Sequence, residues 1–152
     1  MVRSNRAAKK SLVTDAREAV ATCAGMIARL AARRISGFLD SRLRPTGLSA
    51  AQFGLMSHIA AAQDDTIGAL AGRSGLDQST LSRNLRTLER AGLVEITLVE
   101  DDLRRRAVWL TETGARRLEA AMPHWRAAQK ALAKGVDVIA LQSLAEQAVA
   151  VG

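Results

Sequence analysis

The hydrophobic period of this chain changes after Gly92, and that change limits the possible folds more than any other feature of the sequence. Before Gly92, apolar residues recur every three to four positions, the spacing that places them on one face of an α-helix. Residues 93–99 and 105–111 instead follow a period of two, with polar residues 100–104 between them, so they predict two strands joined by a turn. We therefore expect a mainly α fold that contains one small β-hairpin.

Local start and stop signals place the helices around this hairpin. Thr14, Ser49, Asp77 and Thr111 have side chains of the kind that cap helix N-termini. Pro45 and Gly92 end helices, and Pro123 should kink the helix that contains it. The expected helices cover residues of about 14–43, 49–62, 66–74, 77–92, 111–134 and 137–149.

The helix expected over residues 14–43 is long for a chain of 152 residues. Its apolar residues, among them Val20 and Ile27, recur at spacings of three and four. A small core in one chain cannot cover both ends of such a helix, so we expect its apolar stripe to meet a second chain. Residues 1–12 are polar and basic without periodicity, which predicts a flexible arm.

The charge balance favours an anionic partner. The chain carries 22 Lys and Arg residues against 15 Asp and Glu residues, for a net charge of +7. This excess suits a nucleic acid, an acidic protein or an anionic membrane surface without choosing among them.

The single cysteine, Cys23, rules out an internal disulfide and fits a reducing cytoplasm. No signal peptide precedes the helices, and no stretch approaches the roughly 20 apolar residues of a membrane span, so we expect a cytoplasmic protein.

The third and fourth expected helices have the proportions of a helix-turn-helix. A short helix, a turn containing Gly75 and a capped second helix are its components. Leu81, Leu85 and Leu88 share one face of the second helix and should dock on the core. Away from this face, the helix carries residue types that contact DNA, namely Gln78, Ser79, Thr80, Ser82, Arg83 and Arg86. An ordinary solvated helix face has a similar composition, so this helix alone leaves both interpretations open.

The hairpin that follows favours DNA, because a two-stranded ribbon after such a helix forms a wing. Its tip contains Arg104, Arg105 and Arg106, which repel one another and gain nothing by packing together. These arginines suit phosphates or a narrow minor groove, where negative potential is concentrated. Asp101 and Asp102 lie just before them, and a carboxylate there can hold one guanidinium in a fixed orientation.

Three runs of this sequence resemble the MarR family of bacterial transcription regulators. They are LRPTGLSAAQFGLM, LDQSTLSRNLRTLERAGLVE and DDLRRRAVWLTETG. The resemblance is most specific where Asp102 and Arg104 fit the wing signature D-x-R, and where Leu110, Thr111 and Gly114 fit L-T-x-x-G. It extends over residues of about 15–150.

The resemblance implies a single domain over residues 13–152. Its winged helix-turn-helix lobe would cover residues 47–112, and helices in 13–46 and 113–152 would form an intertwined homodimer. The two recognition helices would enter successive major grooves of a pseudo-palindromic operator in double-stranded DNA. Arg104 would enter the minor groove, oriented by Asp102. Many members of the family are repressors that a small anionic aromatic ligand or an oxidant releases.

A ligand site would lie between the dimer helices and the DNA-reading lobe. By rough position, the residues that line it would be Met26, Arg29, Arg33, Phe53, Met56 and Trp125. Arginine beside aromatic and thioether groups suits a phenolic acid. The alternative is that the methionines and aromatic residues belong to the core and the arginines to the surface.

Cys23 offers a redox alternative, since the hydroperoxide-sensing branch of the family places a reactive cysteine on its first helix. Reactivity requires a lowered pKa and access to solvent. Cys23 instead falls on the apolar stripe, and the chain has no tyrosine to hold the sulfur as that branch does. His58 and His124 are too far apart in the sequence to suggest a metal site, and we expect His58 to be exposed.

Two other classes of function compete with a DNA-binding regulator. An enzyme would need a phosphate-binding loop, a nucleophile with its base, or a metal-ligand cluster, and the sequence contains none of these patterns. We therefore expect neither enzymatic activity nor a cofactor. A winged helix that binds proteins is the second alternative. It would carry apolar or acidic groups in place of Ser82, Arg83, Arg86 and the wing arginines.

Overall fold

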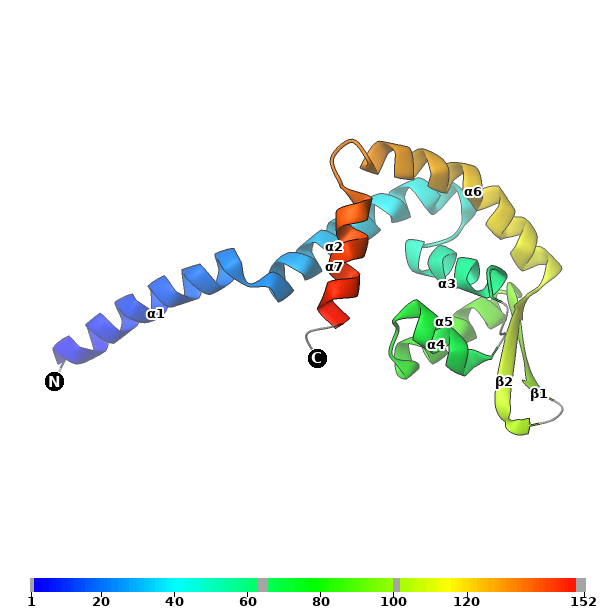
Figure 1. Ribbon diagram of the computed structural model, residues 1–152, viewed down its shortest axis with the longest axis horizontal. Coiled ribbons are helices and arrows are strands. Elements are labelled where there is room, and N and C mark those ends of the chain that lie inside the picture. Colours follow the sequence, from blue (N-terminus) through cyan, green and yellow to red (C-terminus); the bar gives the residue numbers. More distant parts are fainter. Residues whose placement is uncertain (1, 63–65, 100–101, 150–152) are drawn as a thin grey trace. The chain divides into compact units, whose positions relative to one another are not determined.

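The computed structural model describes the backbone of residues 2–62, 66–99 and 102–149, and the side chains of residues 9–62, 66–98 and 106–148. These residues form helices and a two-stranded antiparallel sheet, so the predicted fold class is confirmed (Figure 1). The elements are α1 (Val2–Thr22), α2 (Ala24–Leu43), the 3-10 helix η1 (Arg44–Thr46), α3 (Ala50–Ala60), α4 (Ile67–Ser74), α5 (Gln78–Arg90), β1 (Val94–Val99), β2 (Asp102–Leu110), α6 (Glu112–Leu132) and α7 (Val138–Val149). The chain divides into two compact units, Met1–Gly37 and Phe38–Gly152.

The first unit differs from the prediction at the start of the expected helix. Residues 2–12 belong to α1, so the helix does not begin at Thr14, and Met1 lies outside the described residues. The flexibility of this arm stays a prediction. This segment contains neither glycine nor proline, and its Ala, Lys and Arg residues favour a helix without any apolar pattern. Thr14 is not an N-cap, because its hydroxyl donates to the carbonyl of Lys10 within the helix.

The expected helix over residues 14–43 is interrupted at Cys23. The N–H of Cys23 completes α1 by donating to the carbonyl of Ala19, 2.9 Å away, and its own carbonyl begins α2 by accepting from Ile27. The Thr22 hydroxyl donates to the carbonyl of Glu18 at 2.8 Å, a type of bond that competes with the backbone ladder and often bends helices. Neither a proline nor a change of apolar period marks this position in the sequence.

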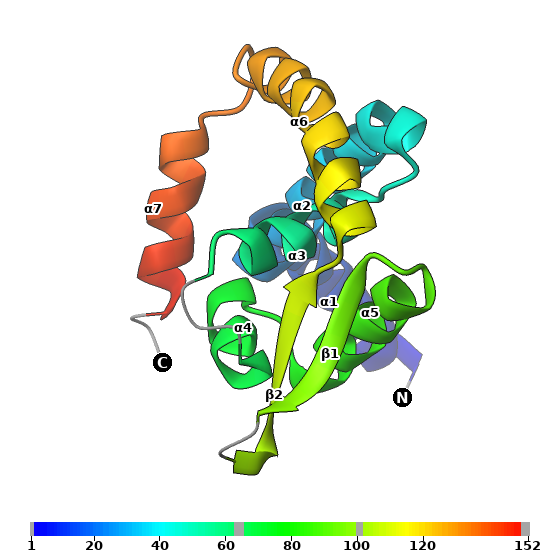
Figure 2. The same cartoon turned by 90° about the vertical axis from the view of Figure 1, so that its right-hand side faces the viewer.

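The second unit has a core made of helices α3 to α6 and the hairpin (Figure 2). Leu81, Leu85 and Leu88 are buried as predicted, together with Phe53, Leu55, Met56, Ile59 and Leu70, while Ala71 of α4 is only partly buried. Leu43 at the end of α2 and Leu93 just before β1 are buried with them. One continuous apolar cluster therefore holds the helix-turn-helix against the hairpin.

Capping side chains set the start of the helices in this unit. Ser49 accepts from the N–H of Gln52, whose side chain accepts in turn from the N–H of Ser49, so both partners of a capping box are present. Asp40 of α2 also accepts from the N–H of Ala50 at 2.6 Å. The carboxylate of Asp40 therefore fastens the end of α2 to the N-terminus of α3.

The hairpin is paired from Val94 opposite Leu110 to Leu98 opposite Arg106. The register then shifts before Val99 pairs with Asp102, so β2 begins inside the segment that the sequence predicts as a turn. A separate antiparallel bridge joins Ala107 of β2 to Thr66, the N-cap of α4. The wing is thus fastened directly to the first helix of the helix-turn-helix.

A tight junction connects the hairpin to α6. The hydroxyl of Thr111 donates to the carbonyl of Gly92 at 2.6 Å and accepts from the N–H of Gly114 at 3.0 Å. A Cβ atom on Gly114 would lie 1.9 Å from the carbonyl oxygen of Leu93, so only glycine fits there. The hydrogen bonds of Thr111 and the close packing of Gly114 therefore explain why these two residue types stand three positions apart. Beyond this junction, α6 continues through Pro123 and curves along its length (Figure 1).

Candidate nucleic-acid interface

The outward face of α5 carries a stripe of hydroxyl and cationic side chains. Leu81, Leu85 and Leu88 are at most 1% exposed and turn one face of the helix into the core. The opposite face is exposed at positions spaced by four, three and four residues, which are Ser79, Arg83, Arg86 and Arg90. We call these four residues the α5 stripe.

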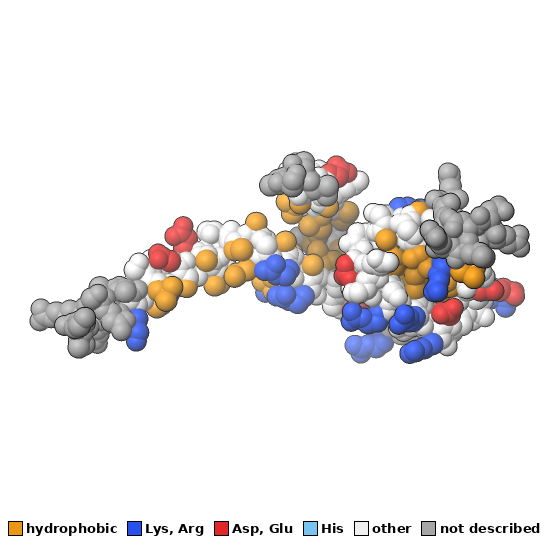
Figure 3. Space-filling view, turned by 90° about the horizontal axis from the view of Figure 1, so that it is seen from below, with side chains coloured by type: hydrophobic (Ala, Val, Ile, Leu, Met, Phe, Trp, Pro, Cys, Tyr) orange, Lys and Arg blue, Asp and Glu red, His pale blue; other side chains and the backbone are white. Residues whose placement is uncertain are grey.

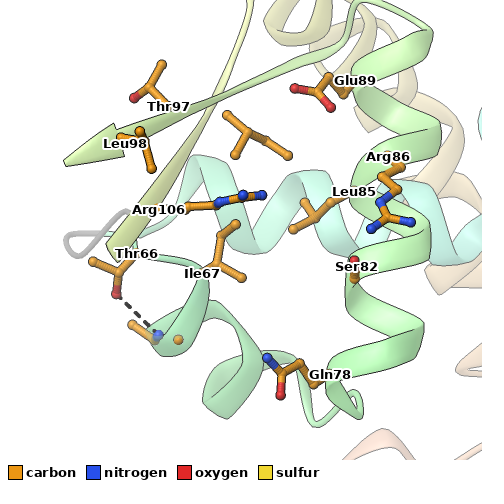
Figure 4. A pocket seen from close by; sticks show the side chains of 13 residues that line it. Thr66, Ile67, Gln78, Ser82, Leu85, Arg86, Glu89, Thr97, Leu98 and Arg106 are labelled. Atoms are coloured by element: carbon orange, nitrogen blue, oxygen red, sulfur yellow. Dashed lines mark hydrogen bonds between the residues drawn. The ribbon is translucent and has the colours of Figure 1, made fainter. Parts of the chain in front are cut away.

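The side of α5 that faces the wing lines a hollow of about 970 Å³. Gln78, Ser82 and Glu89 line it from the helix, and Thr97 lines it from β1. Figure 4 shows the side chain of Arg106 extending from β2 into this hollow toward α5. Figure 3 shows Lys and Arg side chains along the margin of this unit and apolar side chains within a hollow beside them. A concave surface bordered by cations suits a polyanion.

The first turn of α5 is organised around the carboxylate of Asp77. Its Oδ1 accepts from the N–H of Thr80 at 2.9 Å and from the hydroxyl of Ser79 at 2.7 Å. Its Oδ2 accepts from the hydroxyl of Thr80 at 2.6 Å. The hydrogen bonds from Thr80 and Ser79 hold the pKa of the Asp77 carboxyl well below its usual range. Asp77 therefore remains an ionised acceptor.

The structure brings together most of the residues that the sequence assigned to DNA. Gln78, Ser82, Arg86 and Arg106 line the hollow, and Ser79 and Arg83 lie on the exposed face of α5. Thr80 is partly buried on the far flank of α5 and is bonded to Asp77. The side chains of Asp102, Arg104 and Arg105 lie outside those that the structure describes, so the proposed pairing of Asp102 with Arg104 stays a prediction.

Sequence reasoning missed Arg90 and the contribution of α4. Arg90 lies four residues beyond Arg86 and extends the α5 stripe by one turn, a signal that was present in the spacing. Thr66 and Gly68 of the α4 N-terminus also line the hollow. Their position depends on the bridge between Thr66 and β2, which no local sequence pattern predicts.

The residues predicted for a ligand site fall into separate groups. Phe53 and Trp125 stack with ring centroids 5.9 Å apart and line a largely apolar cleft of about 510 Å³ between α2, α3 and α6. Met56 is fully buried in the core. Met26, Arg29 and Arg33 are exposed residues of the first unit. A ligand site made of all six residues stays a prediction.

The remaining candidate residues occupy scattered positions. Cys23 is half-buried at the break between α1 and α2. His58 is exposed, as expected, and so is His124. Among the described residues, no group of three or more His, Cys, Asp or Glu side chains is placed to hold a metal ion. Within the same part of the chain, no helix combines the length and apolar character needed to cross a membrane.

Comparisons with known proteins agree on one family. The family model described as MarR family matches residues 46–105. The M. tuberculosis transcriptional regulator MosR, solved in complex with DNA, is 32% identical, with 86% of this chain and 96% of that chain covered and a TM-score of 0.78. A mutant of E. coli MarR complexed with operator DNA is 26% identical, with 82% and 91% covered and a TM-score of 0.72.

A more distant structure shares the fold alone. The MepR–DNA complex from S. aureus is 20% identical, with 86% of this chain and 96% of that chain covered and a TM-score of 0.70. No curated protein sequence matches this chain.

Proposed function

The chain belongs to the MarR family of transcriptional regulators, and from this premise we propose that it binds double-stranded DNA in a sequence-specific manner through α5 and the wing. The observation that carries the proposal is the α5 stripe, which places Arg83, Arg86 and Arg90 on one exposed face. An α-helix fits the major groove, where arginine recognises guanine and also reaches phosphates. Arg106 borders the same surface from the wing.

Salt dependence of binding tests this proposal. Neutralising phosphates releases counterions, so affinity for a selected operator should fall steeply as salt rises. Arg83→Ala and Arg86→Ala should each weaken binding, and a variant that loses a phosphate contact should lower the salt slope by about one unit. Arg126→Ala, an exposed arginine of α6, is the matched control and should change neither. A salt-independent affinity, or equal losses in all three variants, would contradict the proposal.

For the wing, we propose that Arg104 enters the minor groove with Asp102 as its orienting partner. The neighbouring cation Arg106, which extends into the hollow beside α5, supports a wing that faces DNA. Arg104→Ala should weaken operator binding, and Asp102→Ala should reproduce much of that loss. If Arg104→Ala weakens operator binding while Asp102→Ala leaves it unchanged, Asp102 does not orient Arg104.

We further propose that the protein acts as a homodimer through helices in residues 13–46 and 113–152. Apolar side chains stand uncovered on these helices, with Val20 67% exposed in α1, Ile27 51% exposed in α2 and Leu144 56% exposed in α7. Uncovered stripes of this kind mark interfaces between chains. A two-fold dimer presents two α5 helices and therefore matches a pseudo-palindromic operator.

Sedimentation tests the dimer directly. The chain should sediment as a dimer at micromolar concentration, and Ile27→Asp should shift it toward the monomer, because a charge would have to be buried unpaired. Thr87→Asp, at an exposed position of α5 outside these helices, is the charge-changing control and should remain a dimer. A stable wild-type monomer at that concentration would refute the dimer.

Finally, we propose that the protein is a cytoplasmic repressor that a small anionic aromatic ligand releases from DNA. The cleft lined by Phe53 and Trp125 supports this part, since aromatic walls suit an aromatic ring. In a Trp109→Phe background, which leaves Trp125 as the sole tryptophan, benzoate should quench the fluorescence and lower operator affinity. Loss of operator binding on peroxide treatment, abolished by Cys23→Ser, would favour the redox alternative instead.

A further inference from the structure

The hydroxyl groups at the start of α5 have their protons already engaged. Ser79 donates to Oδ1 of Asp77 at 2.7 Å and Thr80 donates to Oδ2 at 2.6 Å. A hydroxyl has one proton and two acceptor lone pairs, so each group retains only the ability to accept. The suppressed pKa of Asp77 means that the carboxylate stays ionised and cannot reverse these bonds.

Only one of these two hydroxyls belongs to the exposed stripe. Ser79 lies four residues before Arg83 and is exposed, whereas Thr80 is partly buried on the flank. Because the Ser79 oxygen is held as an acceptor beside a carboxylate, it cannot donate to a phosphate, all of whose exposed oxygens are themselves acceptors. The negative charge of Asp77 also disfavours a phosphate at this end of α5.

We propose that Asp77 is a positioning residue that makes Ser79 a specificity-determining acceptor, which reads the exocyclic amino group of an adenine or a cytosine in the major groove. This inference rests on the proposed DNA-binding function and refines it. In the major groove, adenine N6 and cytosine N4 are donors, whereas guanine O6 and thymine O4 are acceptors. Ser79 therefore favours the amino bases and disfavours the keto bases at one position of each half-site. Without Asp77, a serine hydroxyl would rotate and serve either kind.

The test begins with the operator that the full-length protein selects from random DNA. Each adenine of a half-site is replaced in turn by purine deoxyriboside, and each cytosine by 2-pyrimidinone deoxyriboside, both of which lack the amino group. Each phosphate is replaced separately by a methylphosphonate. Affinities are measured for the wild type, Ser79→Ala and Asp77→Ser. Serine is itself a good N-cap, and alanine is a good helix former, so both variants keep α5 intact.

One amino-group deletion per half-site should cost the wild type about tenfold in affinity and should cost Ser79→Ala less than about twofold. The identity of the analogue at that position then distinguishes adenine from cytosine. Asp77→Ser should accept a keto base at the same position with less than about a threefold penalty, while the wild type rejects it by about tenfold. Every methylphosphonate should affect wild type and Ser79→Ala equally.

Two results would overturn the inference. One is that no amino-group deletion distinguishes wild type from Ser79→Ala. The other is that Ser79→Ala couples to a methylphosphonate, which would make Ser79 a phosphate donor. In both cases an operator has been selected and the proposed function stands. Failure to select any operator would instead reject the proposed function itself.

Discussion

The helix α5 and the stretch from α1 into the first half of α2 have similar amphipathic patterns and opposite environments. In α5 the leucines at spacings of four and three are buried within the second unit, and Leu88 is 0% exposed. In α1 and the first half of α2 the apolar residues at similar spacings stand open, with Val20 67% and Ile27 51% exposed. An apolar stripe thus indicates that a helix must be covered, but not whether its own chain covers it. The second unit closes its core alone, and the first unit does not.

The largest expected effect comes from emptying the closed core. Leu88→Ala should lower the free energy of unfolding by about 2–5 kcal/mol, since the buried side chain leaves a cavity. Denaturant titration at two protein concentrations measures the loss, which should be the same at both because the defect lies inside one chain. A loss that disappears at high concentration would mean that the core of this unit is completed by a second copy.

The glycines of the two regions provide a second comparison. Gly114→Ala should cost about 3 kcal/mol, because the added Cβ would collide with the backbone carbonyl of Leu93. Gly37→Ala, in α2, has nothing within 4 Å of its added Cβ and should stabilise the helix by up to about 1 kcal/mol. Thermal melting should show a lower melting temperature for Gly114→Ala and a higher one for Gly37→Ala. Equal effects would show that the junction before α6 is loose.

Helix caps distinguish the regions at a smaller scale. Ser49→Ala should cost about 1 kcal/mol, since it removes an oxygen that accepts from the N–H of Gln52. Thr14→Ala should change stability by less than about 0.5 kcal/mol, because Thr14 lies inside α1 and caps nothing. A comparable loss in both variants, measured by urea titration, would place a helix start at Thr14 after all.

The smallest expected effect is a change in acid stability that involves only the start of α5. Folding lowers the pKa of Asp77, so its contribution is complete above the ordinary aspartate pKa of about 4 and is lost as pH falls below it. The difference between the melting temperatures of the wild type and Asp77→Asn should therefore be largest at pH 6 and should narrow as pH falls from 4 to 2.5. A constant difference over this range would mean that the charge of Asp77 plays no part in stability.

Local chemistry explains which parts of the fold were predictable. Ser49, Asp77 and Thr111 indicate helix starts because each accepts from a backbone N–H only three residues away. The break at Cys23 gave no such signal, since a threonine hydroxyl bonded to the preceding turn is common within continuous helices. Residues 2–12 have no apolar period and therefore predict an arm rather than a helix, whereas their helix propensity alone accounts for this part of α1.

The candidate interface was predictable where it depends on spacing and hidden where it depends on contacts between distant segments. The positions of Ser79, Arg83 and Arg86 follow from the turn of one helix. The bridge from Thr66 to Ala107 joins residues that are far apart in the sequence. Only the structure therefore reveals that residues of α4 line the hollow. Likewise, only the distance in the structure reveals that the Ser79 hydroxyl donates its proton to Asp77.

The junction at Leu93 has a mechanical consequence. The N–H of Leu93 donates to the carbonyl of Leu88 at the end of α5, and the carbonyl of Leu93 accepts from the N–H of Thr111 just before α6. Gly114 leaves no free space against that same carbonyl. A tilt of α6 at this junction therefore acts on Leu93, and through it on the end of α5 and the base of the wing. The hydrogen bond from Thr111 to Gly92 carries the same movement to the residue between α5 and β1.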